Sequence, residues 1–269
     1  MHEIESLRAK VADLERELQA LRSGEMEANS FTKFPPRSLA WRVGGADSNG
    51  RVFPDFLISG HQVVCNLLAL LKDIDKGPAD FRRLLDFGCG CGRVTRFLAY
   101  ERFAAQLVGC DIDPEAIAWC RENIPAVDFQ VTPYTPPLSF SDDSFDFIYS
   151  ISIFTHLHPE EQFAWLQELR RIASPGAILI LSVQGHNRNW SRLPDEVKAR
   201  LEHDGIWYDS DNLYFEQSHT YGFRFPETFK LTYHTVQYIQ REWSKYFEIL
   251  RIAERAVSYD QDAVVLVKR

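Results

Sequence analysis

The feature that most constrains this chain is an apolar run ending in an acid and followed by three alternating glycines. The run Leu84–Phe87 predicts a buried parallel strand, and helical spacing of apolar residues follows it from Val94. Glycines at these places allow positive φ and bring backbone amides close to a ligand. They are Gly88, Gly90 and Gly92. The stretch therefore predicts a nucleotide-type cradle at the tip of a strand.

The spacing of the glycines restricts the kind of nucleotide. A dehydrogenase fingerprint needs a third glycine three residues after the second, and Arg93 occupies that place, with Thr95 three residues beyond Gly92. A triphosphate-binding P-loop is excluded because no Gly-Lys-Ser/Thr sequence ends the loop. The loop therefore favours a ligand without phosphates.

A second strand is expected at Gln106–Cys110, and it ends at Asp111. A carboxylate at a strand tip can accept hydrogen bonds from both hydroxyls of an unphosphorylated ribose. Asp113 and Pro114 follow as an N-cap and a proline at the first helical position. We therefore assign ribose binding to Asp111 and helix capping to Asp113.

Four ordered motifs carry a resemblance to a known family. They are Leu-Leu-Asp-Phe-Gly-Cys-Gly-Cys-Gly-Arg, Gly-Cys-Asp-Ile-Asp-Pro, Phe-Ser-Asp-Asp-Ser-Phe-Asp and Ile-Ser-Ile-Phe-Thr-His-Leu. In this order and spacing the chain resembles the class I S-adenosylmethionine-dependent methyltransferases, well over residues 80–184 and more loosely from residue 35 onward. The resemblance implies an α/β Rossmann-like fold, with a mostly parallel seven-stranded sheet, an antiparallel C-terminal hairpin and helices on both faces. It also implies S-adenosyl-L-methionine as the cofactor.

Candidate cofactor-binding residues follow from the loop, the strand tips and this resemblance. After the third expected strand, Asp128–Val131, the family usually places an acid or amide near the adenine, whereas this chain has Thr132 and Tyr134, which can equally form a turn. The full set is Asp86, Gly88, Cys89, Gly90, Gly92, Arg93, Asp111, Ile112, Thr132, Tyr134, Ser150 and Ile151.

The composition restricts the kinds of ligand and partner that we expect this protein to bind. The net charge of −8 gives no electrostatic footprint for nucleic acid, so no nucleic-acid partner is expected. Five cysteines, odd in number, argue against a disulfide framework, and the Cys89-x-Cys91 pair lacks the spacing of a structural zinc site, so no metal is expected. With no signal peptide and no long apolar run, we expect no membrane span and a cytoplasmic location.

The chain divides into three parts. Residues 1–22 repeat apolar residues every three or four positions and predict a coiled-coil segment, which pairs with a copy of itself, docks on a partner protein or lies on its own domain. Residues 23–34 predict a linker, and residues 35–269 the methyltransferase domain. Within the domain we expect a short extended piece at Ser38–Gly45 and a helix at Phe53–Lys72.

The tip of the fourth expected strand, Phe145–Ser150, lacks the Asn/Asp-Pro-Pro-aromatic motif of related enzymes that methylate amide or nucleobase nitrogen. A hydroxyl acceptor must lose a proton, and histidine suits that role near neutral pH. His156, just beyond this strand, is our first candidate for the general base, with loop support as its alternative role. His186, beyond the fifth strand Ala177–Val183, is the second.

Residues 187–234 interrupt the alternation of strands and helices with an aromatic-rich insertion. An insertion at this place commonly covers the acceptor in methyltransferases, although a simply packed subdomain is an equal alternative. His158, Tyr221 and His234 are the candidate acceptor contacts. A helix near Val236–Tyr246 and strands Phe247–Ala253 and Asp262–Lys268 are expected to close the domain.

The sequence thus predicts an O-methyltransferase that acts on a small metabolite or a saccharide hydroxyl by in-line methyl transfer, with histidine as the base. Two alternatives remain open. One is N-methylation of an aliphatic amine, and the other is a non-catalytic, cofactor-binding partner or scaffold protein tethered by the coiled coil.

Overall fold

The computed structural model describes residues 33–44, 53–101, 103–104, 106–186, 190–211, 230–257 and 261–269. The predicted coiled coil at residues 1–22, most of the predicted linker and Tyr221 lie outside these ranges. From Pro35 to Arg269 the described residues belong to one compact unit. No helix in those ranges is both long and apolar enough to cross a membrane.

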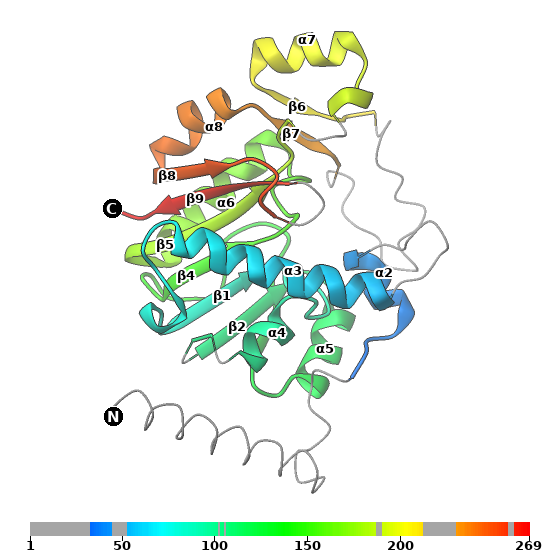
Figure 1. Cartoon of the computed structure of the whole chain (residues 1–269), viewed down its shortest axis with the longest axis vertical. Helices are drawn as coiled ribbons and strands as arrows, with labels where there is room; N and C mark the ends of the chain where they lie inside the picture. Colours follow the sequence, from blue (N-terminus) through cyan, green and yellow to red (C-terminus); the bar gives the residue numbers. More distant parts are fainter. Residues whose placement is uncertain are drawn as a thin grey trace, which may run out of the picture. The chain divides into compact units, whose positions relative to one another are not determined.

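The unit is built on a sheet of seven strands in the order β3-β2-β1-β4-β5-β9-β8 (Figure 1). The strands are β1 (Arg83–Phe87), β2 (Gln106–Asp111), β3 (Asp128–Val131), β4 (Phe145–Ser150), β5 (Ala173–Val183), β8 (Glu248–Ala253) and β9 (Asp262–Val267). The first five are parallel, whereas β9 runs antiparallel between β5 and β8. This is the expected mostly parallel sheet with an antiparallel C-terminal hairpin.

Helices cover both faces of the sheet (Figure 1). The helices of this part of the chain are α2 (Arg37–Gly44), α3 (Phe53–Lys72), α4 (Thr95–Tyr100), α5 (Pro114–Asn123), α6 (Pro159–Ile172) and α8 (Val236–Glu242), with two short 3₁₀ turns, η1 (Pro78–Asp80) and η4 (Trp243–Lys245). The inner strands are buried on both faces, so they are apolar rather than alternating. A large core cluster joins the sheet to α6 and to Ile239 and Trp243 of the α8–η4 segment.

The segment expected to be extended at Ser38–Gly45 is instead the helix α2. Pro36 precedes this helix rather than interrupting it, and its carbonyl accepts the amides of Leu39 and Ala40, both at 3.0 Å. Leu39 and Ala40 are buried in a cluster with Phe56 of α3. Proline is compatible with a helix start, and burial of this apolar face against α3 supplies the stability that such a short helix lacks alone.

The fifth strand also begins earlier than predicted. β5 starts at Ala173 rather than Ala177, directly after α6, and Ala173 pairs with Phe145 of β4. Ser174, Pro175 and Gly176 are residue types common in turns, but they lie within the strand on its exposed approach to the sheet. Local turn signals were therefore overridden by pairing with β4.

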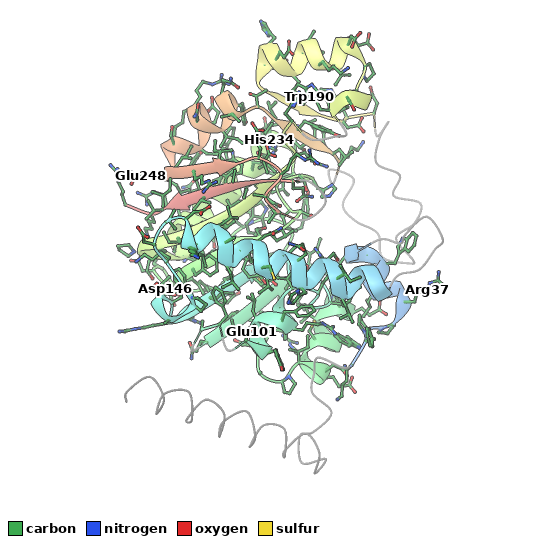
Figure 2. All side chains as sticks on the ribbon, viewed as in Figure 1. Arg37, Glu101, Asp146, Trp190, His234 and Glu248 are labelled. Carbon is green, nitrogen blue, oxygen red and sulfur yellow. The ribbon has the colours of Figure 1, made fainter. Side chains whose placement is uncertain are left out.

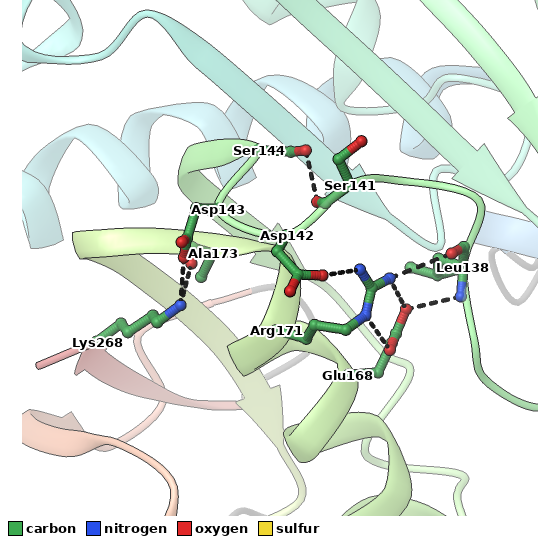
Figure 3. Close-up of polar contacts among 9 residues, drawn as sticks. All are labelled: Leu138, Ser141, Asp142, Asp143, Ser144, Glu168, Arg171, Ala173 and Lys268. Atoms are coloured by element: carbon green, nitrogen blue, oxygen red, sulfur yellow. Dashed lines mark hydrogen bonds and ion pairs between the residues drawn. The ribbon is translucent and has the colours of Figure 1, made fainter.

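A network of charges ties together the end of the sheet that lies away from the glycine loop (Figure 3). Arg171, at the end of α6, donates to Glu168 at 2.6 Å and to Asp142 at 2.6 Å, and Glu168 accepts the amide of Leu138 at 2.7 Å. Nearby, Lys268 donates to Asp143 at 2.5 Å. These contacts link the approach to β4 with α6 and the end of β9.

The aromatic-rich insertion includes a small packed unit. It consists of η2 (Trp190–Arg192), α7 (Asp195–Asp204), β6 (Ile206–Tyr208) and β7 (Thr232–His234). β6 and β7 pair antiparallel, and Trp207 and Tyr233 join a core with Leu201 of α7. β7 also touches the main sheet, because Tyr233 bridges to Gln184 and His234 donates its amide to the Gln184 carbonyl at 2.8 Å. Trp190 and His234 are labelled in Figure 2.

Candidate cofactor and acceptor site

The glycine loop leaves β1 in the backbone conformation that the sequence predicts. Gly88, Gly90 and Gly92 have φ of 87°, 52° and 73°. Three amides of the loop are already bonded within the protein, however. Gly88 and Cys89 donate to the Cys110 carbonyl at 2.8 and 3.0 Å, and Gly90 donates to the Asp111 carboxylate at 2.7 Å. The loop is thus fastened to the end of β2, and these three amides have hydrogen-bond acceptors within the protein.

Side chains from three other elements pack against the loop glycines. A Cβ on Gly90 would lie 2.2 Å from Val43 of α2, and one on Gly88 would lie 2.4 Å from Ile153. At Gly92 the nearest atom would be Ile124 Cδ1, at 2.5 Å. Close approach as well as positive φ therefore explains glycine here.

Asp111 lies at the tip of β2, as predicted. Its Oδ2 accepts the amide of Gly90 and its Oδ1 accepts the amide of Asp113 at 2.9 Å. Burial raises the pKa of this carboxyl to about 6, against the lowering effect of these hydrogen bonds. A hydrogen bond from the Ile112 backbone also acts on this carboxylate. A carboxylate offers about four acceptor positions, so the group can still accept a ribose hydroxyl.

Asp86, the last acid before the loop, is 3% exposed. Thr95 of α4 and Tyr149 of β4 both donate hydroxyl hydrogen bonds to its Oδ2. Burial raises the pKa of Asp86 to about 6. The two hydroxyls hold one oxygen of the carboxylate in place at the base of the loop.

A pocket of about 70 Å³ opens beside the loop at the carboxyl edge of the sheet. It is lined by Phe87, Gly88, Cys110, Asp111, Ile112, Thr132, Tyr134, Ile153, Leu157 and Trp165. Asp111 is the only charged residue in this lining. A mainly apolar slot with one carboxylate at its rim suits a flat aromatic base joined to an uncharged ribose, and it offers no cation for a phosphate.

α2 is held over the start of α5 by ion pairs. Arg42 donates to Asp113 at 2.7 Å and to Glu115 at 2.7 Å, and the Arg42 side chain is only 5% exposed. Asp113 also caps α5, as predicted, by accepting the amides of Glu115 and Ala116. The same carboxylate therefore fixes α5 and anchors α2 next to Gly90.

Several predicted cofactor contacts lie away from the pocket. Arg93 donates to Ser59 of α3 at 3.2 Å, so its guanidinium faces the helix. Ser150 is fully buried inside β4, and Ile151 is 7% exposed. Neither lines the pocket, because the chain reaches it only at Ile153. Cys89 is buried, and its thiol donates to the Gly90 carbonyl, so the side chain packs within the loop itself.

The predicted histidines occupy different environments. His156 lies in the loop after β4, and burial lowers its pKa to about 4. His158 caps α6 and its ring stacks edge-on to Tyr208, with centroids 4.9 Å apart. His186 is exposed beyond β5, with its ring 4.5 Å from that of Trp190.

His234 does not face an open acceptor site. It is 1% exposed, and its Nε2 lies 2.9 Å from the Gln162 side-chain oxygen. Burial lowers its pKa to about 3, so the imidazole is neutral near pH 7. A contact between His234 and the methyl acceptor stays a prediction. In this structure His234 is buried at the junction of β7, α6 and η4.

Sequence reasoning missed several residues of the site, including the pocket-lining residues Phe87, Cys110 and Ile153. Tyr149 and Thr95 orient Asp86, whereas Leu157 and Trp165 line the pocket. Tyr149 lies opposite Asp86 in the β1–β4 register, a pairing that the family strand order could have supplied. Trp165 carried no signal, since an aromatic residue at helical spacing reads as core.

Comparisons with known proteins agree with this geometry. Residues 84–176 match a family model described as a methyltransferase domain. A probable tocopherol O-methyltransferase of Oryza sativa subsp. japonica is 31% identical over 139 residues, which cover 48% of this chain and 36% of that protein. A norajmaline N-methyltransferase of Rauvolfia serpentina is 28% identical over 48% of this chain and 44% of its own length. The chain thus spans less than half of these curated relatives.

Solved structures share the fold. The crystal structure of a protein from Pyrococcus horikoshii OT3 has a TM-score of 0.55 at 21% identity, covering 85% of this chain and 98% of that one. Magnesium protoporphyrin IX methyltransferase from Synechocystis gives a TM-score of 0.54 at 18% identity, over 86% of this chain and 93% of its own. At these identities the likeness shows the fold.

Proposed function

Because residues 84–176 are a methyltransferase domain with the class I fold, we propose that the protein transfers a methyl group from S-adenosylmethionine to a hydroxyl of a small molecule. The observation that carries the proposal is the pocket at the carboxyl edge of the sheet. It combines an apolar slot with Asp111 at its rim and no other charged lining residue. This chemistry fits a nucleoside that carries no phosphate.

The residues present fit the cofactor in two places. Asp111 would accept the ribose hydroxyls, and Ile112, Leu157 and Trp165 would enclose the adenine. S-adenosylmethionine supplies an electrophilic methyl group whose departure leaves a neutral thioether. The protein then has to align the acceptor oxygen with that methyl group and exclude water.

A hydroxyl acceptor must give up its proton as the new O–C bond forms. Of the two predicted bases, His186 is the better candidate because it is exposed to solvent, whereas His156 is buried. Desolvation penalises the charged imidazolium of His156, whose pKa is lowered to about 4, so this residue is a weak proton acceptor. His186 is exposed and can pass the proton on to solvent.

The insertion is connected to the pocket through polar and aromatic contacts. Tyr134, which lines the pocket, donates to Glu161 of α6 at 2.9 Å. Glu161 also accepts the amide of His158 at 3.2 Å, and the His158 ring stacks on Tyr208 of β6. This chain of contacts supports a role for the insertion beside the acceptor.

The curated relatives include enzymes named for O-methylation of tocopherol and for N-methylation of norajmaline. We therefore take phenols as the first acceptor class to test, followed by saccharides and then aliphatic amines as the competing class. The coiled coil at residues 1–22, a homodimer or partner bound through it, and the cytoplasmic location also stay predictions.

The test is transfer of radioactive methyl from S-adenosylmethionine to panels of phenols, saccharides and amines, with His186→Gln as the matched variant. We expect a labelled methyl ether from the wild-type protein and at least about 100-fold less of it from the variant. Labelled amines alone would move the function to N-methylation. Cofactor binding without transfer to any panel would favour the scaffold alternative.

A further inference from the structure

A buried carboxylate lies beside His186 at the edge of the sheet where the acceptor would bind. Asp262 begins β9 and pairs with Val183 at the end of β5. A Cβ on Gly185 would lie 1.7 Å from Asp262 Oδ2 and 2.5 Å from its Cγ. The carboxylate therefore packs against the backbone of the residue that immediately precedes His186, and only glycine leaves room for it.

The surroundings of Asp262 hold its carboxylate in this position. Asp262 is 2% exposed, and its Oδ1 accepts the amide of Arg255 at 2.9 Å. The charges that act on it are Glu254 and Arg255, both in the turn after β8, and His186. Burial raises the pKa of Asp262, whereas His186 and Arg255 counteract that rise. The indole of Trp190 lies on His186 from the insertion side.

The start of β9 also supports the neighbouring strand tip. Ser152, just beyond β4, has a left-handed φ of 64°, which is uncommon for a residue with a side chain. Its amide donates to Ser182 Oγ at 2.7 Å, and its hydroxyl accepts from Gln261 Nε2 at 2.9 Å. Gln261 is 4% exposed. Two successive buried polar residues therefore brace the two loops that frame this part of the edge, and such held backbone is typical of functional sites.

We propose that Asp262 is a positioning residue for His186, an inference that rests on the proposed methyl transfer. The carboxylate accepts a hydrogen bond from one imidazole N–H and so fixes the tautomer, which leaves the other nitrogen to face the acceptor. As the acceptor O–H bond breaks, that nitrogen takes the proton while the oxygen forms its bond to the methyl carbon and the carbon–sulfur bond breaks. The resulting imidazolium is stabilised by Asp262 and releases its proton to solvent.

The first measurement is the ring ¹⁵N NMR spectrum of His186 in the full-length protein, with the signals assigned by their loss in His186→Gln. Asp262→Asn keeps the acceptor for the Arg255 amide but replaces Oδ2 with an NH₂ group that donates. The expected result is one dominant imidazole tautomer in the wild type and a changed tautomer ratio in Asp262→Asn, since the hydrogen bond made by one ring nitrogen determines which nitrogen carries the proton. Glu254→Gln, which removes an exposed charge nearby, is the matched control and should keep the wild-type tautomer ratio. The same tautomer ratio in wild type and Asp262→Asn overturns the proposal.

The second measurement is the pH dependence of methyl transfer. Asp262→Asn should lower kcat at least about 10-fold and move the acidic limb of the profile to lower pH, with affinity for S-adenosylhomocysteine unchanged. In a His186→Gln background the same substitution should have no further effect on kcat. Active wild-type enzyme with an unmoved limb in Asp262→Asn contradicts the pairing. Absence of transfer by the wild-type protein, despite the changed tautomer ratio in Asp262→Asn, instead counts against the proposed function.

Discussion

At the scale of single residues, Asp111 has a structural role besides the ligand-binding role proposed for it. Its carboxylate already accepts the amides of Gly90 and Asp113, so it shapes the loop before any ligand arrives. Ribose hydroxyls would add further donors to the same two oxygens. The ionised form gains from each of these bonds, which sets the direction of the pH effect on binding.

Asp111→Asn should weaken binding of S-adenosylhomocysteine by about 1 to 3 kcal/mol, because hydroxyls lose a charged acceptor. Isothermal calorimetry measures the change. Asp128→Asn, an exposed acid at the opposite end of β3, is the matched control and should bind as the wild type does. Wild-type affinity in Asp111→Asn would refute the ribose assignment.

Binding should also depend on pH. Burial raises the pKa of Asp111 to about 6, so the free protein holds this carboxyl protonated at lower pH, whereas the bound hydroxyls favour the carboxylate. Affinity should be full above pH 6 and fall below it, approaching about 10-fold per pH unit. Asp86 also has a pKa of about 6, so calorimetry between pH 5 and pH 8 is repeated in Asp111→Asn. An identical pH dependence in the two proteins would assign the effect to another group.

At the scale of elements, α2 packs against the glycine loop from outside the segment that matches the family model. Val43 packs against Gly90, and Arg42 ties the helix to Asp113 and Glu115 of α5. Gly90 therefore meets two separate demands, a φ of 52° and the absence of a Cβ beneath Val43. The two demands can be separated by a double-mutant cycle.

Gly90→Ala should destabilise the fold by about 2 kcal/mol or more, since the left-handed conformation alone costs about 1 to 2 kcal/mol and the clash adds to it. In a Val43→Ala background the clash is relieved and the cost of Gly90→Ala should fall toward the backbone value. Urea unfolding of the four proteins measures the coupling. Strictly additive effects would show that α2 does not pack on the loop in solution.

Sequence reasoning succeeded where a local pattern fixes a backbone conformation and failed where a distant contact decides. The positive φ at Gly88, Gly90 and Gly92 follows from the alternation itself. The helix at Arg37–Gly44 was missed because burial of Leu39 against α3 is a tertiary contact. Ser150 was predicted to bind the cofactor because it ends a strand, and that contact stays a prediction. In the loop after β4, the residues that line the pocket are Ile153 and Leu157, and their packing could not be predicted from local spacing.

At the scale of the whole molecule, the order of the strands brings the site together. The carboxyl ends of β1 and β2 are adjacent, and the loops after β3 and β4 lie beside them, so residues from Phe87 to Trp165 meet around one pocket. The mostly parallel sheet with its antiparallel hairpin agrees with the fold that the family resemblance implies. Composition and periodicity alone did not predict this arrangement of strands. The insertion was recognised from its aromatic residues, but its antiparallel pair and its bridge to Gln184 were not predictable from local spacing.

The predicted coiled coil belongs to the same scale. Deleting residues 2–22 should leave affinity for S-adenosylhomocysteine unchanged, because the site residues described above all lie beyond Pro35. The deletion should also lower the molecular mass of the assembly measured by light scattering, if two copies pair through this segment. An unchanged mass would remove the homodimer prediction, and a loss of affinity would place the segment at the site.

The most direct test of the account is calorimetric titration of the purified protein with S-adenosylmethionine and S-adenosylhomocysteine, with NAD as the control. The pocket beside the glycine loop contains one carboxylate and no cation among its lining residues. We therefore predict micromolar binding of both sulfur nucleosides and no binding of NAD, with both affinities reduced in Asp111→Asn. No detectable binding of either sulfur nucleoside, or binding of NAD in their place, would contradict the proposed cofactor.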